Sequence, residues 1–236
     1  MASTNENFQC PFCTKKFKRE STLTSHKCVK RDRYNARDTR HMKVAFMMWK
    51  EFMNFNKLSI PKKVQENNEE FLYFVKSSIF VDFDEFATYV VQNDIFKPEE
   101  FITHVITSGI KSRDWCSHKT YQDWVLKCTR YEHPLTGINR SIHALMDWET
   151  LTGNPWNTFF KEASITRVIQ WFESGKLSPW LIYASNAAAD DLLPRITESE
   201  YQHLITYIDP SIWIPIQLRY KDDVKNIQNN LKGFGL

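Results

Sequence analysis

The sequence predicts a mainly α-helical protein with a small N-terminal ββα finger. Only six of its 236 residues are glycine, whereas 42% are apolar and 14% aromatic, a composition that favours helices over a turn-rich β fold and supplies a packed core. Apolar residues recur at helical spacing between cap and stop residues through most of the chain. The exception is the first 28 residues, where cysteines and a histidine stand among aromatic residues.

Residues 8–28 combine candidate metal ligands at a specific spacing. Two cysteines lie two residues apart, as the knuckle of a β-hairpin requires, and twelve residues leave room for a returning strand and a short helix. Thiolates and imidazoles bind Zn²⁺, and one ion can fold a segment too short to fold alone. The predicted ligands are Cys10, Cys13, His26 and Cys28.

The spacing resembles that of the Cys-Cys-His-His zinc finger family, whose apolar positions fall on Phe8, Phe17 and Leu23. The sequence departs from the family at the last ligand, because Cys28 replaces a second histidine. Helical residues i and i+2 point about 200° apart. The helix is therefore expected to end at His26. A metal-free tail is one alternative, and a three-ligand site completed by His41 or water is another.

The resemblance also implies contacts with nucleic acid. In DNA-binding members of the family, the leading residues of the finger helix touch base edges in the major groove. Aligned through His26, the base-reading positions are Arg19, Ser21, Thr22 and Ser25. The flanking cations that would meet phosphates are Lys15, Lys16 and Lys18.

Charge is unevenly distributed, because residues 1–43 carry eleven Lys and Arg against four Asp and Glu. With a formal net charge of +3 for the whole chain, residues 44–236 are mildly acidic. A basic connector at 29–43, expected to be helical, would extend the contact with nucleic acid. Its contributing residues are Lys30, Arg31, Arg33, Arg37 and Arg40, of which the last three would share one helical face.

Four segments are expected along the chain: a disordered lead-in at 1–7, the zinc finger at 8–28, the connector at 29–43 and a mainly helical domain at 44–236. Within that domain an apolar helix is expected at 44–55, followed by one capped by Asp82 and one that begins at Pro98 and stops before Gly109. Further helices are expected at 118–130, at 138–151 before Gly153, and at 165–174 between Ser164 and Gly175.

The last third of the chain has a short apolar segment after Ser178-Pro179 and then a capping box, Thr197 to Glu200, that opens a helix. Asp209-Pro210 is expected to end that helix. An extended piece is expected at 212–216, followed by an amphipathic helix at about 220–231. At helical spacing, most of the tryptophans are expected to be in the core.

These features together predict a non-enzymatic, zinc-dependent accessory protein that binds nucleic acid, with DNA as the expected form, while the helical body docks a partner. Two alternatives stay open: an adaptor whose finger binds protein, and an enzyme of unrecognised type in the helical domain. Cys116 and Cys128, with His118 and His133, fit no metal-site spacing, and no phosphate-binding glycine loop or hydrolase motif occurs.

The finger ending before a Lys/Arg run, together with the segment Leu177–Ile182, looks like zinc-finger proteins of large tailed bacteriophages. This resemblance implies a phage setting, in which the partner would belong to replication, transcription or packaging machinery. Five cysteines without a disulfide framework, no signal segment and no long apolar run predict an intracellular, reducing location without membrane insertion. For a phage protein that location is the host cytoplasm.

Overall fold

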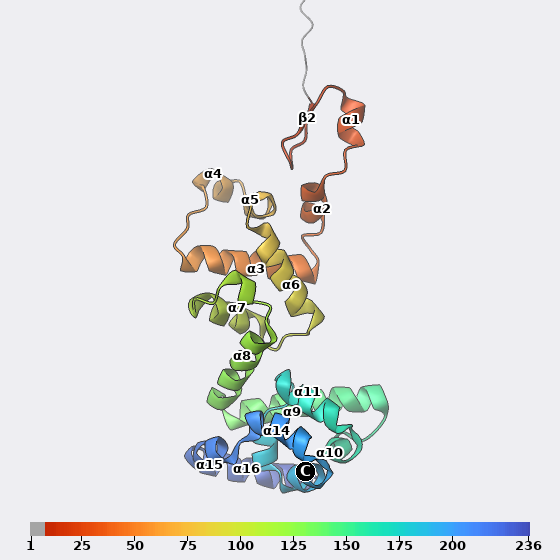
Figure 1. Cartoon of the computed structure of the whole chain (residues 1–236), viewed down its shortest axis with the longest axis vertical. Helices are drawn as coiled ribbons and strands as arrows, with labels where there is room; N and C mark the ends of the chain where they lie inside the picture. The colour runs from red at the N-terminus through yellow and green to blue at the C-terminus, as the bar shows by residue number, and fades with distance from the viewer. Residues whose placement is uncertain (1–7) are drawn as a thin grey trace, which may run out of the picture. The chain divides into compact units, whose positions relative to one another are not determined.

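The computed structural model describes residues 8–236, so the lead-in expected at 1–7 lies outside the described residues. The fold is mainly α-helical with one two-stranded antiparallel sheet near the N-terminus, as predicted (Figure 1). The chain divides into two compact units, the first ending at Ser117 and the second running from His118 to Leu236. The boundaries of the four segments expected from the sequence stay a prediction.

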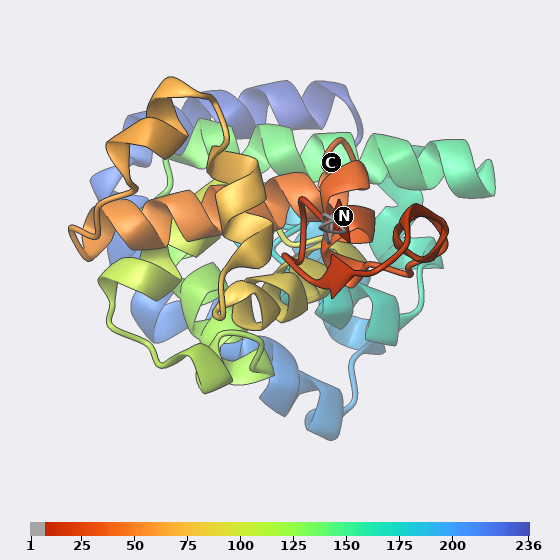
Figure 2. The same cartoon turned by 90° about the horizontal axis from the view of Figure 1, so that it is seen from above.

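The first unit begins with the finger. Strands β1 (Phe8–Gln9) and β2 (Lys16–Phe17) pair antiparallel, with Phe8 opposite Phe17. Helix α1 (Glu20–Thr24) follows and packs against both strands. Figure 2 shows this small lobe in red, and helix α2 (Val29–Asn35) connects it to the rest of the unit.

The connector is helical only in part, which corrects the expectation of one helical face. Helix α2 ends at Asn35, and α3 (Arg40–Phe55) starts anew after Thr39, whose hydroxyl accepts a hydrogen bond from the backbone N–H of Met42 at 3.3 Å. This N-cap resets the helix because Thr39 itself has an extended backbone. Arg33, Arg37 and Arg40 therefore do not share a face.

Helix α3 organises the rest of the first unit, because it packs against α5 (Glu70–Lys76), α6 (Phe80–Gln92) and α7 (Pro98–Thr107). Their shared core is aromatic: Trp49, Phe74, Phe83 and Phe86 are each at most 1% exposed. The short elements of the unit are α4 (Lys62–Glu66), α5 and the 3₁₀ turn η1 (Ser112–Asp114). The expected cap at Asp82 is wrong, because α6 starts at Phe80 with Ile79 as its N-cap residue, which places Asp82 in the first turn.

The second unit is built entirely from helices and short 3₁₀ turns within its described residues. Helix α9 packs against α12 and α16, and α11 packs against α14. The bounds are α8 (His118–Tyr131), α9 (Pro134–Thr152), η2 (Trp156–Thr158), α10 (Phe159–Glu162), α11 (Ile165–Glu173), α12 (Trp180–Ala184), α13 (Asn186–Leu192), η3 (Leu193–Arg195), α14 (Glu198–Ile208), α15 (Pro210–Arg219) and α16 (Lys221–Gly233).

Local signals set several of these ends. Ser164 accepts from the backbone N–H of Arg167 and caps α11, and Thr197 forms the predicted capping box with Glu200. The extended piece expected at 212–216 is wrong, because Asp209 caps a new helix, α15, through the N–H of Ser211 at 2.8 Å. Burial of Trp213 holds that helix in place although Pro215 lies inside it.

A buried polar cluster lies inside the second unit. The Arg140 guanidinium forms two hydrogen bonds with the Glu132 carboxylate, which also accepts a hydrogen bond from the Ser178 hydroxyl, with 2.6 Å between the two oxygens. Gly137 lies against this cluster: a Cβ there would stand 2.5 Å from the Ser178 hydroxyl oxygen and 2.9 Å from a ring carbon of Trp180. The tryptophans are mostly in the core as predicted, with Trp115, Trp124, Trp148, Trp180 and Trp213 buried.

Candidate metal centre and its basic surface

The hairpin knuckle positions the first two thiols. The backbone N–H of Cys10 donates to the Lys15 carbonyl, and the N–H of Thr14 donates to the Cys10 carbonyl, both at 2.9 Å. Thr14 adopts the left-handed conformation, with φ at 61°, which reverses the chain within the knuckle. This tight turn places Cys10 and Cys13 on the same side of the hairpin.

The other two ligand side chains come from the link between α1 and α2. Helix α1 ends at Thr24, two residues before the predicted end at His26, so His26 lies on the turn that follows. Cys28 is the N-cap residue of α2 and has an extended backbone. The chain therefore turns between the two residues, as Cys28 requires in order to face its companions.

All four predicted ligands come together. Their ligand atoms lie within 4.8 Å of one another, with 3.8 Å between the sulfurs of Cys10 and Cys28 and 3.2 Å from the Cys13 sulfur to Nε2 of His26. Two thiolates at about 2.3 Å from one tetrahedral zinc ion stand about 3.8 Å apart. Within residues 8–236 no other group of three or more His, Cys, Asp and Glu side chains has such geometry.

The site is shielded and its thiols are perturbed. Cys10 and Cys28 are buried, whereas Cys13 and His26 are half-buried. Burial raises the pKa of Cys10, but hydrogen bonds from the backbone N–H groups of Cys13 and Phe12 outweigh it and bring the pKa to about 7. Burial and the nearby Cys10 sulfur raise the pKa of Cys28. A lowered thiol pKa favours the thiolate, which is the form that binds metal.

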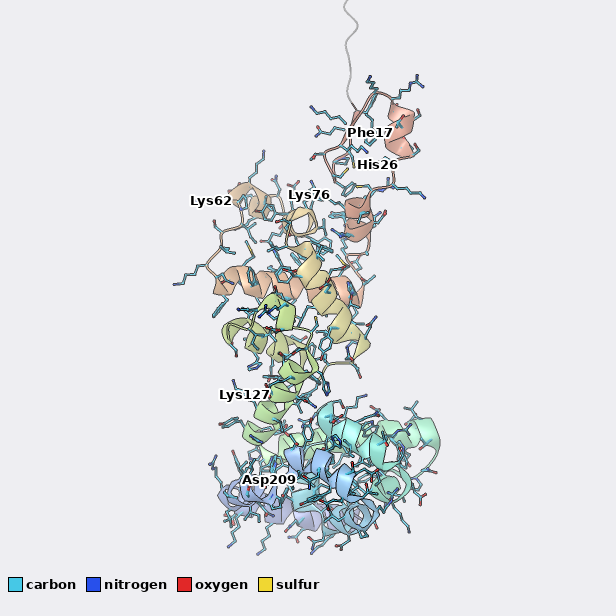
Figure 3. All side chains as sticks on the ribbon, in the orientation of Figure 1. Phe17, His26, Lys62, Lys76, Lys127 and Asp209 are labelled. Atoms are coloured by element: carbon cyan, nitrogen blue, oxygen red, sulfur yellow. The ribbon has the colours of Figure 1, made fainter. Side chains whose placement is uncertain are left out.

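The alternative fourth ligand is engaged elsewhere. His41 lies in α3, where its Nε2 is 2.8 Å from a carboxylate oxygen of Asp84 in α6. Cys28 occupies the fourth position of the cluster instead. Beside the site, the half-buried Phe17 ring lies 4.9 Å from the His26 ring and covers part of the imidazole. Figure 3 labels both residues, which lie next to each other in the finger.

The outer face of the finger is exposed and basic. Every residue at the predicted base-reading positions, Arg19, Ser21, Thr22 and Ser25, is exposed, and so are Lys15, Lys16 and Lys18. No ion pair holds any of these four cations to another residue of the described chain, 8–236. The Lys15 ammonium nitrogen lies 5.8 Å from the centre of the Phe17 ring. These charges are free to meet an external anion.

The five connector cations predicted to meet nucleic acid are placed differently, since each of these five contacts its own chain. Lys30 donates to the Lys76 carbonyl at 3.2 Å, and Arg33 lies over the Phe80 ring at 3.9 Å. The remaining three make weaker contacts: Arg31 with the His26 carbonyl, Arg37 with Asp38, and Arg40 with Asp94.

The knuckle also touches α5 and α2. The Lys76 ammonium donates to the Pro11 carbonyl at 2.7 Å, and the Phe12 ring lies 5.5 Å from the Tyr34 ring, which in turn lies 5.9 Å from that of Phe71. Sequence reasoning missed Lys76, because nothing near it in the chain indicates a partner 65 residues away. The docked side of the finger is the knuckle, and the exposed face of α1 is not part of it.

Elsewhere, no helix among residues 8–236 combines the length and the apolar character needed to cross a bilayer. Comparison of the chain with protein-family models, with curated proteins and with solved structures finds no match.

Proposed function

We propose that this protein binds one Zn²⁺ ion through Cys10, Cys13, His26 and Cys28 and uses the finger so formed to bind nucleic acid, with DNA as the expected form. Three thiols and an imidazole are a preferred donor set for zinc, and a closed set of four protein ligands is typical of a structural site. The ion then serves to hold α1 and the hairpin in place.

The exposed, unpaired cations of the finger carry this proposal. Lys16 lies in β2, and Lys18 and Arg19 lie between β2 and α1, where Arg19 is the N-cap residue and short polar side chains follow it. An arginine can donate two hydrogen bonds to a guanine edge, and lysines meet phosphates as point charges. A finger that only supported the fold would have no need for an unpaired basic face.

A second candidate, a zinc knuckle that only supports the fold of the first unit, is favoured by one observation. The knuckle docks through the hydrogen bond from Lys76 to Pro11 and through the Phe12–Tyr34 contact. Such a knuckle would bind zinc but would not require Arg19. The two candidates therefore differ in what happens when Arg19 is removed.

The test uses the full, zinc-loaded chain. Duplexes selected from a random library are measured by fluorescence anisotropy against unselected duplexes. Arg19→Ala is expected to weaken binding to the selected sequence by roughly 5–150-fold, the range for loss of one bidentate base contact, and to weaken binding to random duplexes far less. Arg113→Ala, which removes an exposed guanidinium from η1, where it lies 3.5 Å from a carboxylate oxygen of Asp114, is the control. No selected sequence, or equal losses for Arg19→Ala and Arg113→Ala, would favour the supporting knuckle.

A further inference from the structure

A pocket beside the finger has the chemistry of a nucleotide site. It lies in the first unit, has a volume of about 340 Å³, and is bordered by α3, by the end of α5 and by the link into α6. Its apolar wall comes from Trp49, Met53 and Ile79. Small-ligand sites typically begin at roughly 300 Å³ and combine such a wall with a few polar groups.

The pocket is also lined by one accessible aromatic ring, that of Tyr73. Tyr73 is 38% exposed, and its ring lies 6.2 Å from that of buried Trp49. Tyrosine that is open on one side and supported on the other is suited to stack on a planar base. Every base has such a face, so this contact alone would not select a sequence.

A polar group in the same pocket lacks a partner. The hydroxyl oxygen of Ser77 is buried and makes no hydrogen bond within the described chain. Buried hydroxyls normally have a partner, and each exception calls for an explanation. Rotation of the Ser77 side chain into the pocket would let a ligand supply a partner, because the edge of a nucleobase carries both donors and acceptors.

Cations surround the segment that lines the pocket. Lys76 borders the pocket and forms no ion pair within residues 8–236. Lys30 contacts the Lys76 carbonyl and Arg33 lies over the Phe80 ring, so two connector cations hold the same segment. Ile79, at the start of α6, makes no side-chain cap, which leaves first-turn N–H groups of that helix available to an anion.

Neighbouring carboxylates oppose this charge only in part. Glu70 is paired with Lys50 at 3.2 Å, and Asp82 lies exposed in the first turn of α6. We propose that the pocket binds one unpaired nucleotide, with its base against Tyr73, its edge on the Ser77 hydroxyl and its phosphate on Lys76. The inference deepens the nucleic-acid function proposed above and rests on it. It adds a preference for single strands or for duplexes with an unpaired end.

The test measures binding of the single strand (dT)8 to the full, zinc-loaded chain by fluorescence anisotropy. Tyr73→Ala is expected to weaken binding by roughly 5–150-fold, the range for loss of one base stack. Ser77→Ala should weaken it by about 2–10-fold, while the midpoint of thermal unfolding stays the same or rises, because the substitution removes a buried hydroxyl that has no partner. Lys76→Met should reduce the slope of the salt dependence by about one.

Controls separate the pocket from general effects. Tyr131→Ala removes a 78% exposed tyrosine from α8, and Lys62→Met removes an exposed cation from α4 (labelled in Figure 3). Neither change should alter (dT)8 binding by more than about 2-fold. Zinc content is measured for Lys76→Met, because this residue also contacts the knuckle.

The outcomes distinguish this inference from the function on which it rests. If selected duplexes respond to Arg19→Ala while (dT)8 binding ignores all three pocket variants, the pocket inference is wrong and the finger proposal stands. If (dT)8 binding depends on the pocket but no duplex binding depends on Arg19, the finger proposal is wrong and the pocket stands. Binding of N-acetyltryptophanamide with the same variant dependence, without (dT)8 binding, would identify the pocket as a protein-docking site and overturn the inference.

Discussion

The salt dependence of duplex binding follows from how the structure divides the basic residues. Of the eleven Lys and Arg of residues 1–43, nine are predicted to meet nucleic acid: Lys15, Lys16, Lys18 and Arg19 in the finger and five in the connector, which leaves Lys27 and Lys43 outside the prediction. The structure leaves those four finger cations exposed and free of ion pairs among residues 8–236, whereas each of the five connector cations has a contact within its own chain. We therefore expect about four phosphate contacts, made by the finger alone.

The magnitude follows from counterion release. Each neutralised phosphate contributes about −0.9 to the slope of log K against log salt concentration. Four contacts give a slope of about −3.6, which corresponds to a loss of about 150-fold in affinity between 50 and 200 mM salt. If the five connector cations also met phosphates, the slope would approach −8 and the loss would be nearly 10⁵-fold.

The assay is anisotropy of a labelled 12-base-pair duplex with the full chain across this salt range. Lys18→Met should lower the slope by about 0.9, and Arg33→Met, which removes a guanidinium already placed over Phe80, should leave it unchanged. Both variants remove one charge, so net charge alone cannot explain a difference between them. A slope near −8, or an equal change for both variants, would refute the assignment of phosphate contacts to the finger.

Three further predictions concern the fold. Cys10→Ser should abolish stoichiometric zinc binding and increase hydrogen exchange in residues 8–28. The second unit should keep its protection from exchange, because only the finger lacks a core of its own. Loss of protection in α9 would contradict this prediction. Gly137→Ala should destabilise the second unit by about 2 kcal/mol or more in urea unfolding, because the added Cβ collides with Ser178 and Trp180. In the control Gly233→Ala the added Cβ meets nothing within 4 Å, so the change should be neutral or stabilise by up to about 1 kcal/mol. Thr197→Ala should cost about 1 kcal/mol by removing the capping box of α14, and a wild-type unfolding midpoint would contradict that role.

The parts of the structure that the sequence predicts are those set by local chemistry. Caps act over three residues, so Ser164 and Thr197 could be assigned from the chain alone. The candidate metal ligands are also set by short-range spacing. A knuckle and a short helix fix the positions of Cys10, Cys13 and His26. The turn before Cys28 was also predictable, since only a turn after the helix could bring the Cys28 sulfur to the other three candidate ligand atoms.

The rest depends on contacts between distant residues. Helices α4 and α5 are short, and α5 is held by packing on α2 and α3, which no local pattern announces. The connector looked like one helix because its arginines recur at helical spacing, but the Thr39 cap restarts the chain. The sequence predicts an extended segment at 212–216, where Pro215 is a poor helix residue. Burial of Trp213 outweighs the free-energy cost of placing that proline inside α15.

The distribution of the basic residues shows the same limit. Arg33 and Lys18 are equivalent in the sequence as cations near a finger. Only the fold separates them, by placing one over the Phe80 ring and the other in solvent. The pocket at Tyr73 and Ser77 had no signal in the sequence, because its walls come from three elements.

The central claim is that one zinc ion held by three sulfurs and one imidazole builds the finger. Substitution with Co²⁺ tests it most directly, because the visible spectrum reports both ligand type and coordination number. The account predicts one metal ion per chain and a tetrahedral spectrum with sulfur-to-cobalt charge transfer that weakens in Cys28→Ser. A metal content near zero, or a spectrum of six-coordinate cobalt with oxygen ligands, would contradict it.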